Sequence, residues 1–302
     1  MQVGLSVYNI DAGDLVDLAR AAEDAGFASL WLGEHVVLPV GYSSEHPTTG
    51  TRTAARRPHR QPIVDPATKL LDPLVALAAC AAVTRRITLA TGILLVPLRP
   101  PLLAARMVHT LHGLSAGRLV LGVGAGWLRE EFEALGAPYD SRGRRLAESL
   151  QIMRAAWGGG PFVHRGEFFQ LERLQLCEQP VHVPVIMGGN SDPALRRAAR
   201  LGDGWFASGT PELDEACRLR ERVLAYRAEM GPGGPFRLFA RVGGADPDAV
   251  ERYRAAGWDH VLVWADRVWP PGSDLEAKRA SLAAAARALG LVPEPPVGRV
   301  PA

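Results

Sequence analysis

The chain has 302 residues with 34 basic and 32 acidic side chains, so its formal net charge is +2, and 47% of its residues are hydrophobic. This composition excludes a disordered chain, which needs few apolar residues and a large net charge, and it lacks the basic excess of a nucleic-acid binder. Three scattered cysteines are too few for a disulfide framework or a zinc site. The sequence contains no run of about 18 apolar residues, which is the length that spans a membrane. Its first residues do not show a signal-peptide pattern, so we expect a cytoplasmic protein.

Short apolar segments alternate with amphipathic segments along the chain. Apolar runs bounded by turn residues predict strands over residues 3–8, 29–33, 86–96, 118–123, 183–187, 204–207, 236–242 and 260–264. Apolar residues at helical spacing predict helices over residues 11–26, 71–84, 101–114, 128–135, 142–157, 193–201, 211–230, 247–257 and 275–289. Eight strand–helix units predict a parallel sheet covered on both faces, and they fit a closed (β/α)8 TIM barrel. An open, doubly wound sheet is the alternative.

Three stretches interrupt this alternation. Residues 36–66 form a long polar insertion after the second strand, at the barrel mouth where TIM-barrel active sites lie, and such loops are usually lids or binding loops. Residues 158–183 contain HRGEFFQLERLQL, which predicts a β-hairpin inserted before the fifth strand. Residues 291–302 form a proline-rich tail. Since no linker divides the rest, we expect a single domain over residues 1–290.

Two glycine-rich junctions lie between a predicted strand and the helix that follows it. The first, RLVLGVGAGWLREEF, contains Gly122, Gly124 and Gly126. Because glycine has no Cβ, the backbone there can approach a planar or phosphorylated ligand closely. The spacing does not fit a dinucleotide-binding fingerprint, and the motif does not lie in a first βαβ unit. The alternative interpretation is a tight turn that binds nothing.

The second junction is PVIMGGNSDPALRR. Backbone N–H groups of Gly188, Gly189 and Asn190 would point at an anion in front of the helix, which predicts a phosphate cradle. The alternative is an ordinary helix capped by Asn190, Ser191 or Asp192. Phosphate sites of TIM barrels usually follow strands seven and eight, whereas this junction follows the fifth strand.

Two further motifs lie at strand ends. WLGEHVVLP ends the second strand with Glu34 and His35, and an imidazole there can donate a hydrogen bond to a bound ring or exchange a proton with it. Alternatively, the two side chains only hold the next loop. In TGILLVPLRPP, Gly92 within a strand indicates a bulge or a close ligand. His109 and His112 share one face of an outer helix with no nearby carboxylate, so we expect no metal site.

In their order and spacing, these motifs resemble the bacterial-luciferase-like superfamily of (β/α)8 barrels, and especially its branch of coenzyme F420-dependent oxidoreductases. The match covers about residues 1–290 and rests on Glu34-His35, TGILLVPLRPP, SAGRLVLGVGAGWLREEFEALG, HRGEFFQL and PVIMGGNSDPALRRAARLGDGWF. The resemblance implies a homodimeric oxidoreductase that transfers hydride between the deazaflavin F420 and a small organic substrate. The alternatives are an FMN-dependent monooxygenase of the same superfamily and a catalytically silent flavin-binding protein.

The resemblance also implies roles for particular positions. His35 would assist substrate redox chemistry beside the ring, and Glu34, where many members have aspartate, would be a second catalytic candidate. Trp127 stands where some F420-dependent relatives carry a catalytic glutamate, which leaves His35, the substrate, water or Glu130 as the acid. Gly92–Ile93, often a non-proline cis peptide in the family, would support the ring face. The other cofactor-binding residues would be Gly124, Ala125, Gly126 and Trp127 along the pocket, and Gly188, Gly189, Asn190 and Ser191 at the phosphate.

The choice between F420 and FMN as the cofactor depends on charge. F420 carries a polyanionic oligoglutamate tail, whereas FMN ends in a phosphate. A polyanionic tail favours arginines at the barrel mouth. We prefer F420 because two arginine clusters could meet its tail, and a solvated loop is the alternative for the first of them. The clusters are Arg52, Arg56, Arg57 and Arg60 in the insertion, and Arg142, Arg144 and Arg145 near the start of the next long helix.

Overall fold

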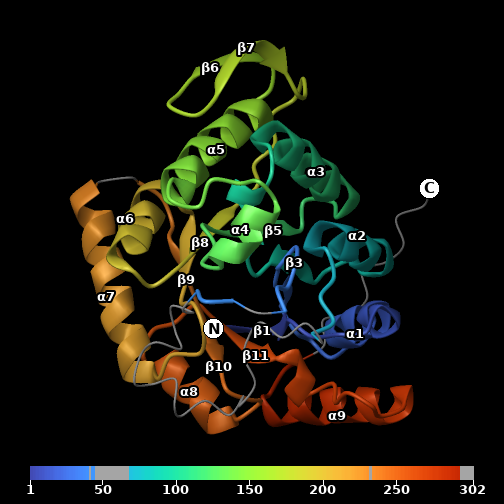
Figure 1. Ribbon diagram of the computed structural model, residues 1–302. Coiled ribbons are helices and arrows are strands. Elements are labelled where there is room, and N and C mark those ends of the chain that lie inside the picture. Colours follow the sequence, from blue (N-terminus) through green and yellow to red (C-terminus); the bar gives the residue numbers. More distant parts are fainter. Residues whose placement is uncertain (41, 45–67, 231–232, 293–302) are drawn as a thin grey trace.

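Eight parallel strands form the centre of the computed structural model, which describes residues 1–40, 42–44, 68–230 and 233–292 (Figure 1). In order around the ring they are β1 (Gln2–Val7), β2 (Ser29–Leu32), β3 (Thr88–Thr91), β5 (Leu119–Gly124), β8 (Val185–Gly188), β9 (Gly204–Phe206), β10 (Arg237–Val242) and β11 (His260–Trp264). The sheet closes on itself because β1 pairs with both β2 and β11 and because β3 pairs with β5. The predicted TIM barrel is confirmed, and the open sheet is excluded.

Helices cover the outside of this barrel, except that the short α4 lies at its mouth (Figure 1). In chain order they are α1 (Ala12–Asp24), α2 (Pro73–Val83), α3 (Pro101–Leu114), α4 (Arg129–Ala134), α5 (Arg142–Trp157), α6 (Asp192–Leu201), α7 (Leu213–Met230), α8 (Pro247–Ala255) and α9 (Leu275–Ala288). In α1, for example, Leu15, Leu18 and Ala22 recur at helical spacing and are buried. Each predicted helix begins and ends within two residues of the observed one. Among the described helices, none is both long and apolar enough to cross a lipid bilayer.

The third strand differs from the prediction of one continuous strand over residues 86–96. It divides into β3 and β4 (Leu94–Leu95), with a cis peptide between Gly92 and Ile93, and a short 3-10 helix, η2 (Val96–Leu98), follows. Both β3 and β4 pair with β5. The bulge expected at Gly92 is thus found, and it changes the direction of the chain at the barrel mouth. Gly92 marked this position in the sequence, but it could not show that the strand divides into two there.

The predicted hairpin is also present. Strands β6 (Pro161–Arg165) and β7 (Gln170–Gln175) pair antiparallel beyond the end of α5 (Figure 1). Glu148 of α5 anchors the hairpin, because its carboxylate accepts hydrogen bonds from the backbone N–H groups of Phe168 (3.0 Å) and Phe169 (2.8 Å). Burial opposes ionisation of Glu148, but these N–H groups and the His164 ring keep its pKa below the usual value. Most of the predicted insertion and of the proline-rich tail lies outside the described residues.

Large side chains fill the barrel interior. Trp31 packs against Phe206 (ring centroids 5.5 Å apart) and Phe239 (4.8 Å), and the smaller members of this cluster are Ala90, Val120, Ile186 and Leu262. At Gly122 the neighbouring strand comes close, since an added Cβ would lie 2.0 Å from the Thr91 carbonyl oxygen. The Thr91 hydroxyl donates a 2.6 Å hydrogen bond to the Gly122 carbonyl. The interior is therefore a packed floor, and the space for a ligand lies above it.

Replacement of Gly122 tests this packing. Gly122→Ala should lower the free energy of unfolding by about 1–3 kcal/mol, because the added methyl group must displace backbone. The matched control is Gly113→Ala in α3, where nothing lies within 4 Å of an added Cβ. Alanine is favoured in helices, so the control should be unchanged or up to about 1 kcal/mol more stable. Urea denaturation measures both values, and a wild-type stability for Gly122→Ala would contradict the close approach.

Candidate active site

The carboxyl ends of the eight barrel strands open into one cavity of about 2390 Å³. Typical ligand pockets measure about 300–1000 Å³, so the cavity has room for a large cofactor together with a substrate. Every barrel strand or the loop that follows it contributes to the lining. The contributions include Ser6 and Tyr8 at the end of β1, His35 after β2, Gly92 and Ile93 after β3, Gly124–Trp127 at the end of β5, Gly188–Ser191 at the end of β8, Ser208 after β9, Arg241 of β10 and Trp264 of β11.

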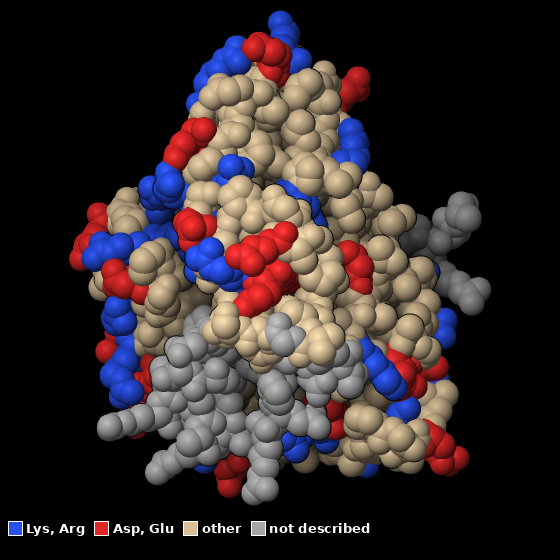
Figure 2. All heavy atoms as spheres, viewed as in Figure 1, with Lys and Arg blue, Asp and Glu red and all other residues tan. Residues whose placement is uncertain are grey.

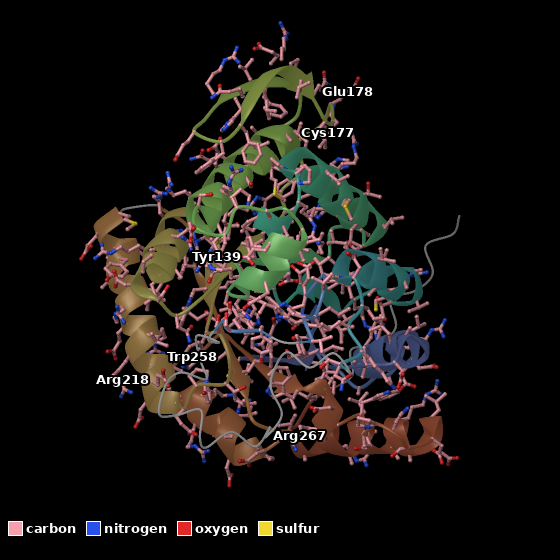
Figure 3. All side chains as sticks on the ribbon, viewed as in Figure 1. Tyr139, Cys177, Glu178, Arg218, Trp258 and Arg267 are labelled. Atoms are coloured by element: carbon pink, nitrogen blue, oxygen red, sulfur yellow. The ribbon has the colours of Figure 1, made fainter. Side chains whose placement is uncertain are left out.

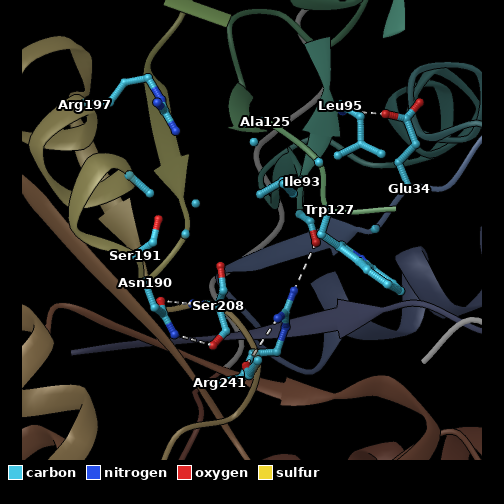
Figure 4. A pocket seen from close by; sticks show the side chains of 18 of the residues that line it. Glu34, Ile93, Leu95, Ala125, Trp127, Asn190, Ser191, Arg197, Ser208 and Arg241 are labelled. Carbon is cyan, nitrogen blue, oxygen red and sulfur yellow. Dashed lines mark hydrogen bonds between the residues drawn. The ribbon is translucent and has the colours of Figure 1, made fainter. Parts of the chain in front are cut away.

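Three of the predicted motifs meet at the side chain of Ile93. An added Cβ at Gly124 would lie 1.8 Å from Ile93 Cδ1, and one at Gly188 would lie 3.2 Å from Ile93 Cγ2. Figure 4 shows Ile93 beside Ala125 and Trp127, and facing Asn190 and Ser191 across the cavity. The reason for these glycines therefore differs from the prediction: Gly124 and Gly188 make room for a protein side chain, which in turn forms the cavity floor.

The loop after β5 is held by side chains from α5 and its entry. Gly126 has φ +85°, a conformation that favours glycine, and its carbonyl accepts a hydrogen bond from Arg142 Nε (2.9 Å). The Tyr139 hydroxyl, labelled in Figure 3, donates to the Trp127 carbonyl (2.8 Å). The Arg142 guanidinium stacks 3.8 Å from the centre of the Tyr139 ring. These contacts fix the Trp127 indole edge-on to the ring of His35, 6.0 Å away.

His35 is paired with a carboxylate that the sequence analysis did not single out. Its Nδ1 lies 2.8 Å from Glu131 Oε2, and the Glu131 side chain is fully buried. The other Glu131 oxygen accepts hydrogen bonds from the backbone N–H groups of Val36 (2.5 Å) and Val37 (3.4 Å). A carboxylate at Nδ1 keeps the proton on that nitrogen. Nε2, which has no hydrogen-bond partner among the described residues, is then available as an acceptor at the cavity.

Glu34 lies beside His35 in the chain but serves a different contact. Its carboxylate accepts hydrogen bonds from the Leu95 backbone N–H (2.6 Å, Figure 4) and from the guanidinium of Arg99. The Glu34 side chain is buried, and burial opposes protonation of Arg99, yet Glu34 raises the pKa of Arg99 above its usual value. Glu34 therefore fastens the segment after β4 to the end of β2.

Glu130, which was expected to be a possible acid, is not among the residues that line the cavity. Its carboxylate accepts hydrogen bonds from the hydroxyl (2.7 Å) and backbone N–H (3.2 Å) of Ser44, and from the backbone N–H of Ser43 (2.7 Å). The Ser44 hydroxyl is the main cause that lowers the pKa of Glu130 to about 2. Glu130 thus ties the start of the insertion to α4, while its neighbour Glu131 points toward His35. Because α4 has six residues, its apolar pattern is too short to predict which acid faces inward.

The predicted cradle follows β8 as expected. Gly189 has φ +117°, and the Asn190 side chain accepts from the Ser208 N–H (2.9 Å) and donates to the Ser208 carbonyl (3.0 Å) (Figure 4). Ser191 occupies the N-cap position of α6, but no side chain caps this helix. The alternative of an ordinary capped helix is therefore not what the structure shows. The turn is rigid, and the start of α6 faces the cavity.

Three arginines without a carboxylate partner lie along α6 and at the start of α5. Arg142, Arg197 and Arg200 line the cavity, and among the described residues no carboxylate pairs with any of them. The Arg197 Nε is buried without a hydrogen-bond partner, and burial, together with Arg142 and Arg200, lowers the pKa of Arg197. Figure 2 shows basic groups gathered over α5 and α6. An orphaned guanidinium beside a helix N-terminus fits a phosphate or another anion.

The two predicted arginine clusters have different outcomes. Arg52, Arg56, Arg57 and Arg60 lie outside the described residues. In the second cluster Arg142 and Arg144 line the cavity, although Arg144 also pairs with Glu167, whereas Arg145 stacks 4.4 Å from the centre of the Phe168 ring. The arginines of α6 were not singled out from the sequence. Their signal was the RRAAR spacing, which is equally typical of a solvated helix face.

Known proteins are similar to this chain over the whole barrel. The sequence model of the family described as luciferase-like monooxygenase matches residues 2–290. The protein Rv0940c of Mycobacterium tuberculosis (strain H37Rv) is 33% identical over 265 residues, which cover 86% of this chain and 88% of that relative.

Solved structures are similar at lower identity. An F420-dependent secondary alcohol dehydrogenase in complex with an F420–acetone adduct has a TM-score of 0.71 and 16% identity, with 95% of this chain and 98% of that chain covered. The oxygenating constituent of 3,6-diketocamphane monooxygenase from Pseudomonas putida, in complex with FMN, has a TM-score of 0.68 and 18% identity, with 96% and 98% covered. Identities this low indicate a shared fold and no more.

Removal of the Glu34 charge tests its contact with Arg99. Glu34→Gln keeps the side-chain shape but leaves the Arg99 guanidinium without its counter-charge. The free energy of unfolding should fall by about 1.5–3 kcal/mol, the range for a hydrogen bond to a charged group. Glu178→Gln at an exposed glutamate (Figure 3) is the control and should change stability by less than about 0.5 kcal/mol. Equal urea midpoints for the two variants would count against a structural contribution of Glu34.

Proposed function

The chain belongs to the luciferase-like monooxygenase family, and from that premise we propose that it is an oxidoreductase that transfers hydride between coenzyme F420 and a small organic substrate. The observation that carries the proposal is one cavity in which His35, the Gly92–Ile93 peptide and the uncompensated arginines of α6 meet. In this proposal one bound ligand would reach a group for proton transfer, a floor formed by Ile93 and an anion site.

The residues at the cavity suit each part of such a cofactor. Ile93, with the space left by Gly124 and Gly188, would support the face of the ring. Gly189–Ser191 together with Arg142 and Arg197 would hold the phosphate, and Arg200 is available for further negative charges. When bound, the ring supplies the hydride chemistry, and the protein supplies position and electrostatics. An extended cationic rim favours a polyanionic ligand over one that ends in a single phosphate.

His35 is the group proposed to move a proton. Its Nε2 would accept the proton that the substrate releases on oxidation, or return it in the reverse direction. Glu131 would act as a positioning residue, because it holds Nδ1 protonated and orients the ring. Glu34 would act further away, by holding the segment that follows Ile93, and Trp127 and Tyr8 would keep water from the reacting atoms.

FMN is the second candidate cofactor, with monooxygenase activity as the alternative function. The cradle of Gly188–Ser191 beside Arg142 and Arg197 is compact enough to serve one terminal phosphate, and the similar diketocamphane monooxygenase is described in complex with FMN. Arg144 pairs with Glu167 and Arg145 stacks on Phe168. If Arg142 of α5 and Arg197 of α6 hold the phosphate, Arg200 of α6 would be the unpaired arginine left for the tail of F420 among the described residues of these two helices. A catalytically silent flavin-binding protein would bind cofactor without turnover.

Cofactor retention distinguishes the two cofactors. After ultrafiltration with each cofactor at micromolar concentration, the wild-type protein should retain F420. Arg197→Met should weaken that binding about tenfold, or about 1.4 kcal/mol, because it removes the buried guanidinium at the cradle. Arg218→Met on the outer face of α7 (Figure 3) is the matched control and should bind as wild type. Retention of FMN without F420 would replace the proposal with the alternative.

Turnover tests the pair of His35 and Glu131. His35→Ala should reduce turnover about 100-fold or more, within the usual range for general acid–base catalysis. Glu131→Gln should reduce turnover less and should also move the pH profile, since it removes the negative charge at Nδ1. The control is Glu133→Gln, an exposed glutamate of the same helix. If His35→Ala with cofactor bound stays within a few-fold of wild type, His35 has no part in the mechanism.

A further inference from the structure

One more arginine lies inside the barrel mouth, away from the cluster at α6. Arg241 is in β10, is only 9% exposed, and lines the cavity. In Figure 4 it lies below Ile93 and beside Ser208, whereas Arg197 lies across the cavity. Its side chain is therefore at the floor where the face of the ring is proposed to rest, and not at the phosphate end.

The Arg241 guanidinium is held in one orientation. Nε donates to the Ser6 hydroxyl (2.8 Å), Nη2 to the Gly92 carbonyl (3.0 Å) and Nη1 to the Gly209 carbonyl (3.3 Å). Its carbon lies 4.4 Å from the centre of the Phe206 ring and 4.8 Å from that of Trp264. A guanidinium has five N–H groups, so these bonds leave one N–H on each terminal nitrogen. The group is a fixed donor and does not need to reorganise when a ligand binds.

The charge of Arg241 has no counter-charge in the described ranges of the chain. Each of its three hydrogen bonds goes to a neutral oxygen, and no ion pair joins it to a carboxylate. Burial lowers the pKa of Arg241 to about 10, so it is still protonated at neutral pH. A buried, unpaired cation is costly. Its presence at a cavity floor is explained if a ligand supplies the negative charge.

We infer that Arg241 is the counter-charge for the ring of the redox cofactor in its reduced form, and so raises the reduction potential of the bound cofactor. This inference rests on the proposed function. A hydride carries two electrons and one proton, so its transfer from the substrate leaves the ring one unit more negative, while the proton that the oxidised substrate releases goes to His35. Since Arg241 bonds the Gly92 carbonyl, it lies next to the peptide proposed to support that ring.

The prediction concerns the difference between two redox states. Arg241 should stabilise the reduced ring more than the oxidised ring, whereas Arg197, at the phosphate, should stabilise both states equally. Removal of each charge therefore has a different expected signature. A purely structural role of Arg241, as a link from β10 to β1 and to the end of β3, would affect both redox states alike.

The experiment measures binding of FMN or F420, whichever the wild-type protein retains, in its oxidised form and after reduction with dithionite. Arg241→Met should weaken binding of the reduced form about tenfold more than that of the oxidised form, a midpoint potential about 30 mV more negative for a two-electron couple. Arg241→Lys should recover most of this difference because it restores the charge. Arg197→Met should leave the ratio of the two dissociation constants unchanged.

Other outcomes would overturn the inference. If Arg241→Met weakens binding of the oxidised and reduced cofactor equally, or leaves the ratio of the two dissociation constants unchanged, Arg241 has only a structural role. If Arg241→Met does not fold, Arg241→Gln keeps a hydrogen-bond donor toward Gly92 without the charge, and an unshifted potential in that variant overturns the inference as well. A wild-type protein that binds neither cofactor would overturn the proposed function first, which separates the two failures.

Discussion

The side chain of Ile93 needs space at the barrel mouth, and much of the site depends on how that space is provided. At Gly124 of β5 a Cβ would collide with Ile93, and at Gly188 of β8 it would make a tight contact with it. Below Ile93, Trp31 and the close approach at Gly122 belong to a packed interior. Because the interior is closely packed, the cavity lies at the carboxyl ends of the strands, where polar groups of every strand can reach it.

Paired and unpaired charges occupy different parts of this cavity. Glu131 and Glu34 lie on the side of β2 and α4, and each carboxylate is satisfied by a His or Arg partner. Arg241 at the floor and Arg197 across the cavity from it have no carboxylate partner among the described residues. A ligand that spans the cavity therefore meets an imidazole at one part and positive charge at others. This arrangement supports the proposed anionic redox cofactor with its substrate near His35. The cofactor would supply negative charge to the unpaired arginines, and the substrate would face the imidazole.

Chain-local patterns predicted several parts of the site. Gly188–Ser191 was recognisable as a strand–glycine–helix junction, and His35 as a polar residue at a strand end, since neither inference needs a distant partner. Glu131 was missed in favour of Glu130, because adjacent acids on a six-residue helix differ only in direction. Arg241 was missed because it lies within an ordinary strand sequence, RLFARV. Its importance appears only when Ser6, Gly92 and Gly209 surround it.

The sequence by itself determined the barrel, the order of its strands and helices, and the hairpin before β8, because periodicity and turn residues act over short stretches of chain. It also placed the motifs at the mouth, since all parallel strands end there. Only the tertiary structure decided which acid meets His35, that Glu34 holds Arg99, and that Arg197 and Arg241 lack counter-charges. Those facts depend on contacts between residues that are far apart in the chain, whose distances no local pattern encodes.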